Sequence, residues 1–356
     1  MANDDDRSVK PLRRTLLVTY PRTASNLVLK MLSLDDQEKV VSNEKGGYFF
    51  WDSYMAERST RCIYKPVLDW APEETEEIQH VLQRITNELE QKSRFAESQG
   101  RLFFAKEHVQ WFTDPAAIGN YISGHCSPTA SPVNIHIPIS YGPVREFSPN
   151  NLTVFPDQYL ETWRLTFLIR HPALAFPSLY RAMRELEKEE FTEAHELQPL
   201  MEIHATLKWT RQLYDWCCKH QADSHDGYSG DDHYPLVLDA QDVIHNPSVI
   251  RRYCKLIGMD PAYVKYDWSA ASSKKTNGES ESIGRKHPET IMKFTLDNSL
   301  HIIKEKTPPF VDIALERKAW DAEFGEVIGK QMEGWVMEAM PDYDYLKSRR
   351  LQVKNT

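Results

Sequence analysis

The sequence contains four short runs rich in β-branched and aromatic residues, each near a segment with helical periodicity. The runs span residues 15–20, 101–106, 164–170 and 234–239. Apolar residues recur with a period of about 3.6, as in an amphipathic helix, over residues 75–98, 172–189, 200–220, 246–257 and 322–340. Strands that alternate with helices are typical of an α/β fold with a parallel sheet. The sequence therefore predicts a parallel sheet covered by helices.

The chain is long enough for one large domain or two ordinary ones. Its 356 residues are 41% hydrophobic and 27% charged, which is a globular composition. Because no repeat or low-complexity linker interrupts the pattern, we expect a single domain over 15–345, with a flexible segment at 1–14 and a tail at 346–356. Two polar stretches, 127–157 and 269–286, are expected to be long loops, which are either binding segments or disordered.

The charge and the cysteine content disfavour several classes of protein. A net charge of −9 argues against nucleic-acid binding, which normally needs a basic face, so any anion site must be local. No window approaches the roughly 20 apolar residues of a membrane-spanning helix, and the first residues do not resemble a signal peptide. Five scattered cysteines without metal-ligand spacing suit reduced thiols. We therefore expect a cytoplasmic protein without nucleic-acid, membrane or metal binding, and the length and loops weakly favour a homodimer.

The turn after the first strand is a candidate anion site. Ser25 or Asn26 is expected to cap the following helix, whose free N–H groups and dipole attract a phosphate or sulfate. Arg22, Thr23 and Ser25 would add a guanidinium and two hydroxyls aimed at the same point. The turn lacks the GxxxxGK pattern of nucleotide-binding P-loops, which disfavours a kinase or an ATPase. An ordinary capped helix with a solvated Arg22 is the alternative.

A second basic residue, Arg170, stands at the end of a strand-like run and directly before a predicted helix. Ligands of open α/β sheets bind at the carboxyl ends of the strands, so Arg170 and the downstream Ser178 are expected to converge there. Pro172 suits the first turn of that helix. The alternative is an Arg170 paired with a nearby carboxylate and a Ser178 that faces solvent.

The run at 101–106 leads into Lys106, Glu107 and His108, which places a histidine at another strand end. An imidazole, with an ordinary pKa of about 6.5, is suited to take the proton of an attacking hydroxyl. The alternative is a structural histidine that caps the next segment or bonds to a backbone carbonyl.

These motifs, in this order, resemble those of the sulfotransferases that use 3′-phosphoadenosine 5′-phosphosulfate (PAPS). Thr-Tyr-Pro-Arg-Thr-Ala-Ser-Asn is similar to their 5′-phosphosulfate loop, and Lys-Glu-His is similar to their catalytic strand. Ile-Arg-His-Pro with its downstream serine resembles their 3′-phosphate site. The segment that begins at Arg285 and Lys286 resembles, more loosely, the loop that closes over the 3′-phosphate. The chain looks like divergent fungal and bacterial members, which are often tied to specialised (secondary) metabolism.

The resemblance implies a P-loop-like three-layer fold, with a central parallel sheet flanked by helices. It implies transfer of a sulfuryl group from PAPS to a hydroxyl of a small metabolite, with 3′-phosphoadenosine 5′-phosphate (PAP) as the leaving product and no metal. His108 would be the general base, with Lys106 near the transferred sulfuryl group and Arg22 near the bridging oxygen. The implied cofactor-binding residues are Arg22, Thr23, Ala24, Ser25, Asn26, Arg170, Ser178, Arg285 and Lys286. Ala24 and Leu27 depart from the family pattern, which usually has a glycine and often an aromatic residue there.

Aromatic residues gather before and after the candidate base, and we expect an apolar acceptor pocket there. The candidate substrate-binding residues are Phe50, Trp51, Glu107 and Trp111. Core or lid packing is the alternative for such a cluster. Two rival functions stay open: sulfation that only creates a leaving group for elimination or cyclisation, and a non-catalytic nucleotide-binding protein of the same fold.

Overall fold

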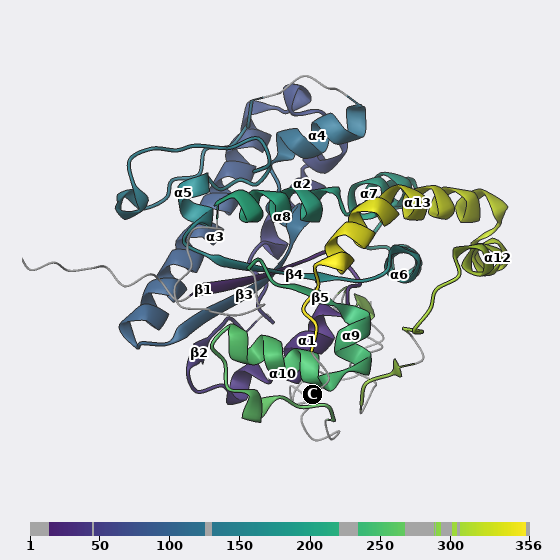
Figure 1. Ribbon diagram of the computed structural model, residues 1–356. Helices are drawn as coiled ribbons and strands as arrows, with labels where there is room; N and C mark the ends of the chain where they lie inside the picture. The colour runs from purple at the N-terminus through teal and green to yellow at the C-terminus, as the bar shows by residue number, and fades with distance from the viewer. Residues whose placement is uncertain are drawn as a thin grey trace, which may run out of the picture.

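A five-stranded sheet forms the centre of the protein, whose computed structural model describes residues 14–44, 46–124, 130–220, 234–267, 288, 290–292, 301–304 and 307–353. The strands are β1 (Arg14–Thr19), β2 (Val40–Val41), β3 (Leu102–His108), β4 (Arg164–Ile169) and β5 (Val237–Asp239). Their order in the sheet is β2-β3-β1-β4-β5, and all neighbours are parallel (Figure 1). The predicted parallel sheet is confirmed, whereas the short strand β2 was not predicted.

Helices cover both faces of the sheet and give three layers (Figure 1). They are α1 (Ser25–Leu32), α2 (Trp51–Ser59), α3 (Pro72–Ser98), α4 (Pro115–Ser123), α5 (Asp157–Leu160), α6 (Pro172–Lys188), α7 (Leu197–His204), α8 (Lys208–His220), α9 (Ala240–His245), α10 (Pro247–Leu256), α12 (Ile313–Phe324) and α13 (Glu326–Ser348). Leu17 packs with α1, α9 and α10 on one face, and its neighbour Leu16 packs with α3, α8 and α13 on the other. Strand side chains alternate between faces, which is why each strand serves two apolar clusters. The fold is thus the three-layer α/β arrangement predicted from the sequence.

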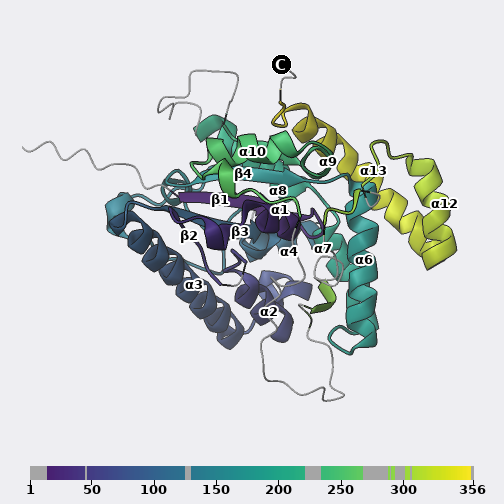
Figure 2. The same cartoon turned by 90° about the horizontal axis from the view of Figure 1, so that it is seen from below.

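Two predicted helices differ from those observed. The segment expected to form one helix over 200–220 forms α7 and α8, because Ala205 leaves the helical conformation and the Thr206 hydroxyl accepts a hydrogen bond from the N–H of Lys208. The segment expected over 322–340 covers the end of α12 and much of α13, which Gly325 separates with a φ of 86°. α12 packs on α13 at the edge of the molecule (Figure 2). The apolar pattern continues across both breaks, so periodicity alone did not reveal them.

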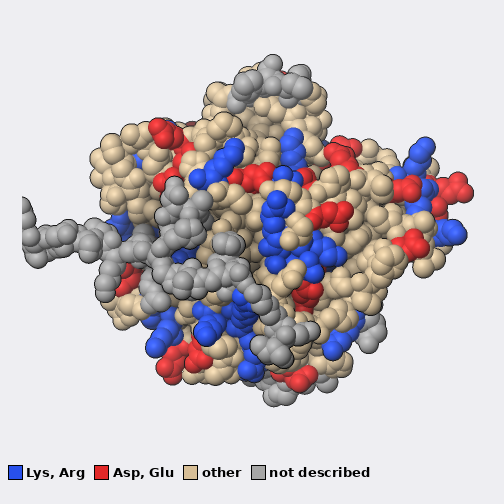
Figure 3. Space-filling model, viewed as in Figure 1, with Lys and Arg blue, Asp and Glu red and all other residues tan. Residues whose placement is uncertain are grey.

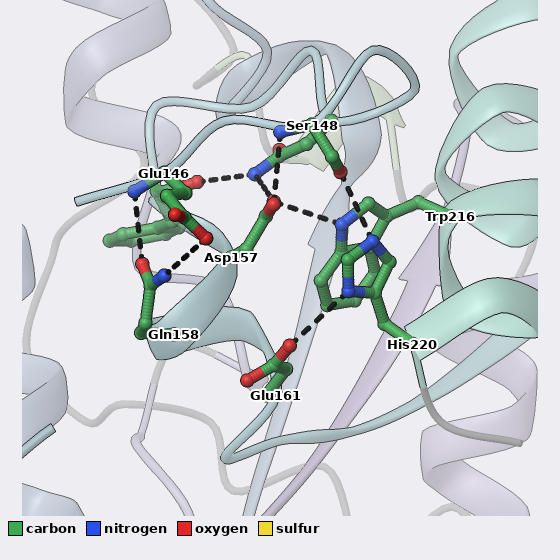
Figure 4. Close-up of polar contacts among 9 residues, drawn as sticks. Glu146, Ser148, Asp157, Gln158, Glu161, Trp216 and His220 are labelled. Carbon is green, nitrogen blue, oxygen red and sulfur yellow. Dashed lines mark hydrogen bonds and ion pairs between the residues drawn. The ribbon is translucent and has the colours of Figure 1, made fainter. Parts of the chain in front are cut away.

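The described part of the loop predicted at 127–157, which begins at residue 130, packs against the protein at both of its ends and is exposed around residues 139–147. Its buried apolar side chains include Val133, Ile135 and Ile137. The buried carboxylate of Asp157 accepts hydrogen bonds from the N–H of Ser148 at 2.9 Å and from Trp216 Nε1 on α8 at 2.9 Å (Figure 4). His220 Nε2 lies 3.2 Å from the Ser148 hydroxyl (Figure 4). This polar network ties the loop to α8.

The N-terminal segment predicted at 1–14 includes one residue that belongs to the sheet. Arg14 is the first residue of β1, and its buried guanidinium forms an ion pair with Glu90 at 2.8 Å. Residues 1–13 and the loop predicted at 269–286 lie outside the described residues.

The tail predicted at 346–356 begins inside α13, which ends at Ser348. Leu346 and Leu351 are buried, and the N–H of Leu351 donates to the carbonyl of Val237 at 2.7 Å. The described residues after α13 are therefore part of the packed domain, because they cover apolar surface next to β5.

Acidic and basic side chains are interspersed on the face shown in Figure 3. Two ion pairs lie near the C-terminal end of α13: Arg350 with Asp242 at 2.6 Å, and Arg211 with Asp342 at 3.3 Å. Across the described ranges, no helix has the length and apolar character needed to cross a membrane.

Candidate functional site

The carboxyl ends of β1, β3 and β4 meet at a cavity of about 1100 Å³, the position at which open α/β sheets bind ligands. Helices α1, α2, α6 and α7 contribute much of the remaining lining, together with single residues of α9 and α12 and described residues between 288 and 307. The cavity lining contains the predicted residues Arg22, Ala24, Ser25, Asn26, Trp51, His108, Trp111, Arg170 and Ser178. The predicted residues Thr23, Phe50, Lys106 and Glu107 lie behind this lining. Arg285 and Lys286 lie outside the described residues.

The turn between β1 and α1 leaves the start of α1 uncapped. Arg22 and Ala24 both adopt left-handed backbone conformations, with φ of 70° and 65°. Ala24 is the N-cap residue, and among the described residues no side chain caps the first turn, so neither Ser25 nor Asn26 provides the predicted cap. Thr23 is fully buried and its hydroxyl donates to the carbonyl of Tyr20 at 3.0 Å. The first N–H groups of α1 are thus left for an anion in the cavity.

Two arginines face the cavity from neighbouring strands. Arg22 Nε donates to Ser178 Oγ at 3.0 Å, and Arg22 Nη1 donates to the carbonyl of Met292 at 2.6 Å. Arg170 Nη1 donates to the carbonyl of Arg22 at 3.0 Å, and its Nη2 donates to Thr307 Oγ1 at 3.3 Å. Burial, with the nearby charge of Arg22, lowers the pKa of Arg170 to about 10. Two partly buried cations that repel each other form a site in which an anion would be stabilised.

Lys106 and His108 point to the same side of β3, because strand side chains alternate. Lys106 is fully buried, and its Nζ donates to Asn26 Oδ1 at 2.6 Å. The same ammonium lies 3.6 Å from the centre of the Tyr48 ring, in a cation–π contact. The lysine is therefore attached to the first turn of α1 but covered on its cavity side by an aromatic ring.

The hydrogen bonds of His108 define its neutral tautomer. The Thr19 hydroxyl donates to the carbonyl of Glu107 at 3.0 Å, so its oxygen accepts from His108 Nδ1, which lies 2.7 Å away. Nε2 is then the unprotonated nitrogen, and it accepts from the Tyr48 hydroxyl at 2.9 Å. Burial, with the nearby charge of Lys106, lowers the pKa of His108 well below its ordinary value. This tautomer places the basic nitrogen on the cavity side.

Glu107 points to the opposite face of the sheet and does not reach the cavity. Its Oε1 accepts from the backbone N–H groups of Phe49 and Phe50, the latter at 3.1 Å. Burial among apolar side chains raises the pKa of this carboxyl to about 8. Glu107 and the buried Phe50 therefore hold the segment before α2 against β3, whereas the predicted residues Trp51 and Trp111 do line the cavity.

An aromatic wall closes the part of the cavity beyond His108. The ring of Trp111 lies 4.5 Å from the imidazole, 5.0 Å from Tyr48 and 5.6 Å from Tyr54, measured between ring centres. His204, at the end of α7, packs against Tyr54 and also lines the cavity. Sequence reasoning did not assign Tyr48, Tyr54 or His204 to the site. For Tyr48 and Tyr54 the signal was the aromatic run at the start of α2, which was interpreted only as a general pocket, whereas His204 lies outside that run.

The chain has curated relatives along nearly its whole length. Sulfotransferase ppzF of Metarhizium rileyi (strain RCEF 4871) is 36% identical over 344 residues, covering 96% of this chain and 96% of that protein. Sulfotransferase ppzF of Metarhizium majus (strain ARSEF 297) is 35% identical over 348 residues, covering 97% and 98%. The solved sulfotransferase domain of the Synechococcus PCC 7002 olefin synthase is 14% identical, with a TM-score of 0.36, and the match covers 87% of this chain and 94% of that one. No family model matches the chain.

Proposed function

Because this chain belongs to the sulfotransferase family, we propose that it moves a sulfuryl group from PAPS to a hydroxyl of a small metabolite, with His108 as the general base. The observation that carries the proposal is the convergence at one cavity of a neutral imidazole, two arginines and an uncapped helix start. A base beside a cluster of positive groups is what transfer of a negatively charged group to a hydroxyl requires.

The residues at the cavity fit a donor with two anionic ends. The open N–H groups at the start of α1 and the Arg22 guanidinium would hold the 5′ end, and Arg170 with Ser178 would hold the 3′-phosphate. Arg22 contacts Ser178, so the two anion sites adjoin. In the described part of the chain, no carboxylate forms an ion pair with Arg22, which leaves its charge available to a ligand.

The chain's own residues would accept the proton of the acceptor hydroxyl and stabilise the negative charge that develops during transfer. His108 Nε2 takes the proton of the acceptor hydroxyl while the acceptor oxygen forms its bond to sulfur. PAPS supplies the sulfuryl group, and the bond that breaks is the one between sulfur and the bridging oxygen of the 5′-phosphate. Arg22 and Lys106 stabilise the negative charge that grows on that oxygen. Thr19 keeps the imidazole in the tautomer that this step needs.

The acceptor would occupy the aromatic part of the same cavity. A volume of about 1100 Å³ exceeds the roughly 300–1,000 Å³ of an ordinary ligand pocket, which leaves room for a donor and an acceptor together. Trp51, Tyr54 and Trp111 line this part, so we propose an acceptor with a substantial apolar or aromatic surface.

Calorimetric binding of PAP tests the proposal. We expect micromolar binding by the wild-type protein and a loss of about 10- to 150-fold in Arg170→Ala, because bonds to charged groups contribute roughly 1.5–3 kcal/mol each. Arg184→Ala removes an arginine from the exposed side of α6, the helix that follows Arg170, where it pairs with Glu187 at 2.9 Å, and is expected to bind as the wild type does. Absence of binding by folded wild-type protein would contradict the donor assignment. An acceptor screen that uses product mass, with His108→Ala as control, then tests the transfer.

A further inference from the structure

We infer that Tyr48 is a positioning residue. Its hydroxyl occupies Nε2 of the general base, His108, until the hydroxyl of an acceptor takes its place. The inference rests on the proposed function, because it concerns the same base and the same transferred group. Tyr48 stands on the segment between β2 and α2, and its side chain makes two contacts that matter to the reaction. Its hydroxyl lies 2.9 Å from His108 Nε2, and its ring lies over the Lys106 ammonium at 3.6 Å.

The hydroxyl contact occupies the nitrogen that has to accept a proton. The hydrogen of Nδ1 is directed to Thr19, so Nε2 is the basic site of the neutral ring. The Tyr48 hydroxyl donates to that site, and the rings of Tyr48 and Trp111 lie 5.1 Å and 4.5 Å from the imidazole, measured between ring centres. His108 is only 6% exposed. An acceptor hydroxyl therefore reaches the base only by taking the place of the tyrosine hydroxyl.

The ring of Tyr48 covers the ammonium of Lys106, the second group that the reaction needs. Lys106 lies on the same side of β3 as His108 but does not line the cavity, whereas Tyr48, whose ring lies over the Lys106 ammonium, does line it. Rotation of this one side chain would expose both the base and the cation. One side chain therefore controls access both to the basic nitrogen of His108 and to the ammonium of Lys106.

The backbone beneath Tyr48 is held in place, which confines the movement to its side chain. The N–H of Lys106 donates to the carbonyl of Gly47 at 3.0 Å, and the N–H of Gly47 donates to Asn43 Oδ1 at 2.7 Å. Asn43 Nδ2 donates in turn to the carbonyl of Tyr48. Gly47 has a φ of 84°, and a Cβ there would lie 3.1 Å from Lys106 Cβ, so only glycine allows this close approach.

Exchange of the Tyr48 hydroxyl for an acceptor hydroxyl costs little free energy and favours ligands that carry a hydroxyl. A hydroxyl of the acceptor that bonds to Nε2 replaces one neutral hydrogen bond by another, so the base is uncovered without a large penalty. An apolar molecule without a hydroxyl displaces Tyr48 only by leaving Nε2 without a partner, which is unfavourable in a buried site. Tyr48 thus favours acceptors that present a hydroxyl to the base.

Nitrogen NMR of protein labelled with ¹⁵N in its histidine rings tests the inference without an acceptor. Comparison with His108→Gln assigns the His108 resonances. In Tyr48→Phe we expect the Nε2 resonance to move toward that of an unbonded nitrogen and the pKa of His108 to rise by roughly half to one pH unit, because a bond of about 0.5–1.5 kcal/mol to the neutral form is removed. Tyr54→Phe removes the same atom from a neighbouring tyrosine and should leave the His108 resonances in place.

Release of PAP from PAPS in the absence of any acceptor gives the second readout. Water is the only nucleophile in this assay, and we expect Tyr48→Phe to raise the rate about 2- to 10-fold over the wild type. Unchanged His108 resonances together with an unchanged release rate would overturn the inference, and a merely structural role of Tyr48 would lower thermal stability without either change. Failure of PAP to bind would instead contradict the proposed function and leave the nitrogen resonances to decide the role of Tyr48.

Discussion

Replacement of the buried carboxyl of Glu107 by an amide should make the stability of this protein less dependent on pH. Burial raises the pKa of Glu107 from 4.5 to about 8 in the folded protein. Because the folded value is the higher one, the protonated carboxyl stabilises the fold at low pH, and this contribution is lost as the pH rises from 4.5 to about 8. Each pH unit in this range lowers the free energy of unfolding of the wild type by about 1.4 kcal/mol. The free energy of unfolding of Glu107→Gln should therefore rise by about 3 kcal/mol relative to that of the wild type between about pH 5.5 and about pH 7.5.

Urea unfolding of both proteins at several pH values measures this difference. Glutamine keeps the oxygen that accepts from Phe49 and Phe50 and carries no charge at any of these pH values. Glu97→Gln removes a carboxylate from the exposed end of α3 and serves as the control. A difference between Glu107→Gln and wild type that stays constant over the range would refute the reasoning, because it would mean that Glu107 is ionised in the folded protein throughout.

The remaining predictions concern the base and the two turns beside it. Since burial and Lys106 lower the pKa of His108, kcat/KM should stay constant as the pH falls from about 8 to about 6.5, and a decline within that range in a pH–rate profile would contradict the assignment. Ala24→Gly should raise the free energy of unfolding by about 1 kcal/mol, because glycine adopts a φ of 65° without strain; a lower melting temperature would argue against it. Gly47→Ala should lower the free energy of unfolding by roughly 1–3 kcal/mol in urea titration, and an unchanged value would show that the contact with β3 is loose.

The sequence was sufficient to predict the parallel sheet and most of the residues at its carboxyl edge. Arg22, His108 and Arg170 each follow an apolar run, and in a parallel sheet such positions meet at one edge whatever the details of packing. Glu107 was assigned to the same site although alternation along a strand directs it to the other face. The period of two, applied strictly to Lys106, Glu107 and His108, separates the structural carboxyl from the two site residues.

The contacts of Tyr48 depend on information that no local pattern contains. β2 is only two residues long, and its pairing of Val40 with Leu102 brings the segment that carries Tyr48 next to β3. A strand of this length has no detectable period. The hydrogen bond from the Thr23 hydroxyl to the carbonyl of Tyr20 could not be predicted from a local pattern either, because it depends on a turn in which non-glycine residues have positive φ.

The residues after α13 also determine when the sheet can be finished during synthesis. Leu351 bonds to Val237, and Arg350 forms a parallel bridge with the same residue of the edge strand β5. β5 leaves the ribosome long before these partners do, so its outer edge stays open while α12 and α13 are still being made. An open strand edge is a site for pairing with other chains. Until residues 350 and 351 are synthesised, the outer edge of β5 is therefore open to such pairing, and removal of residues 349–353 would leave it open.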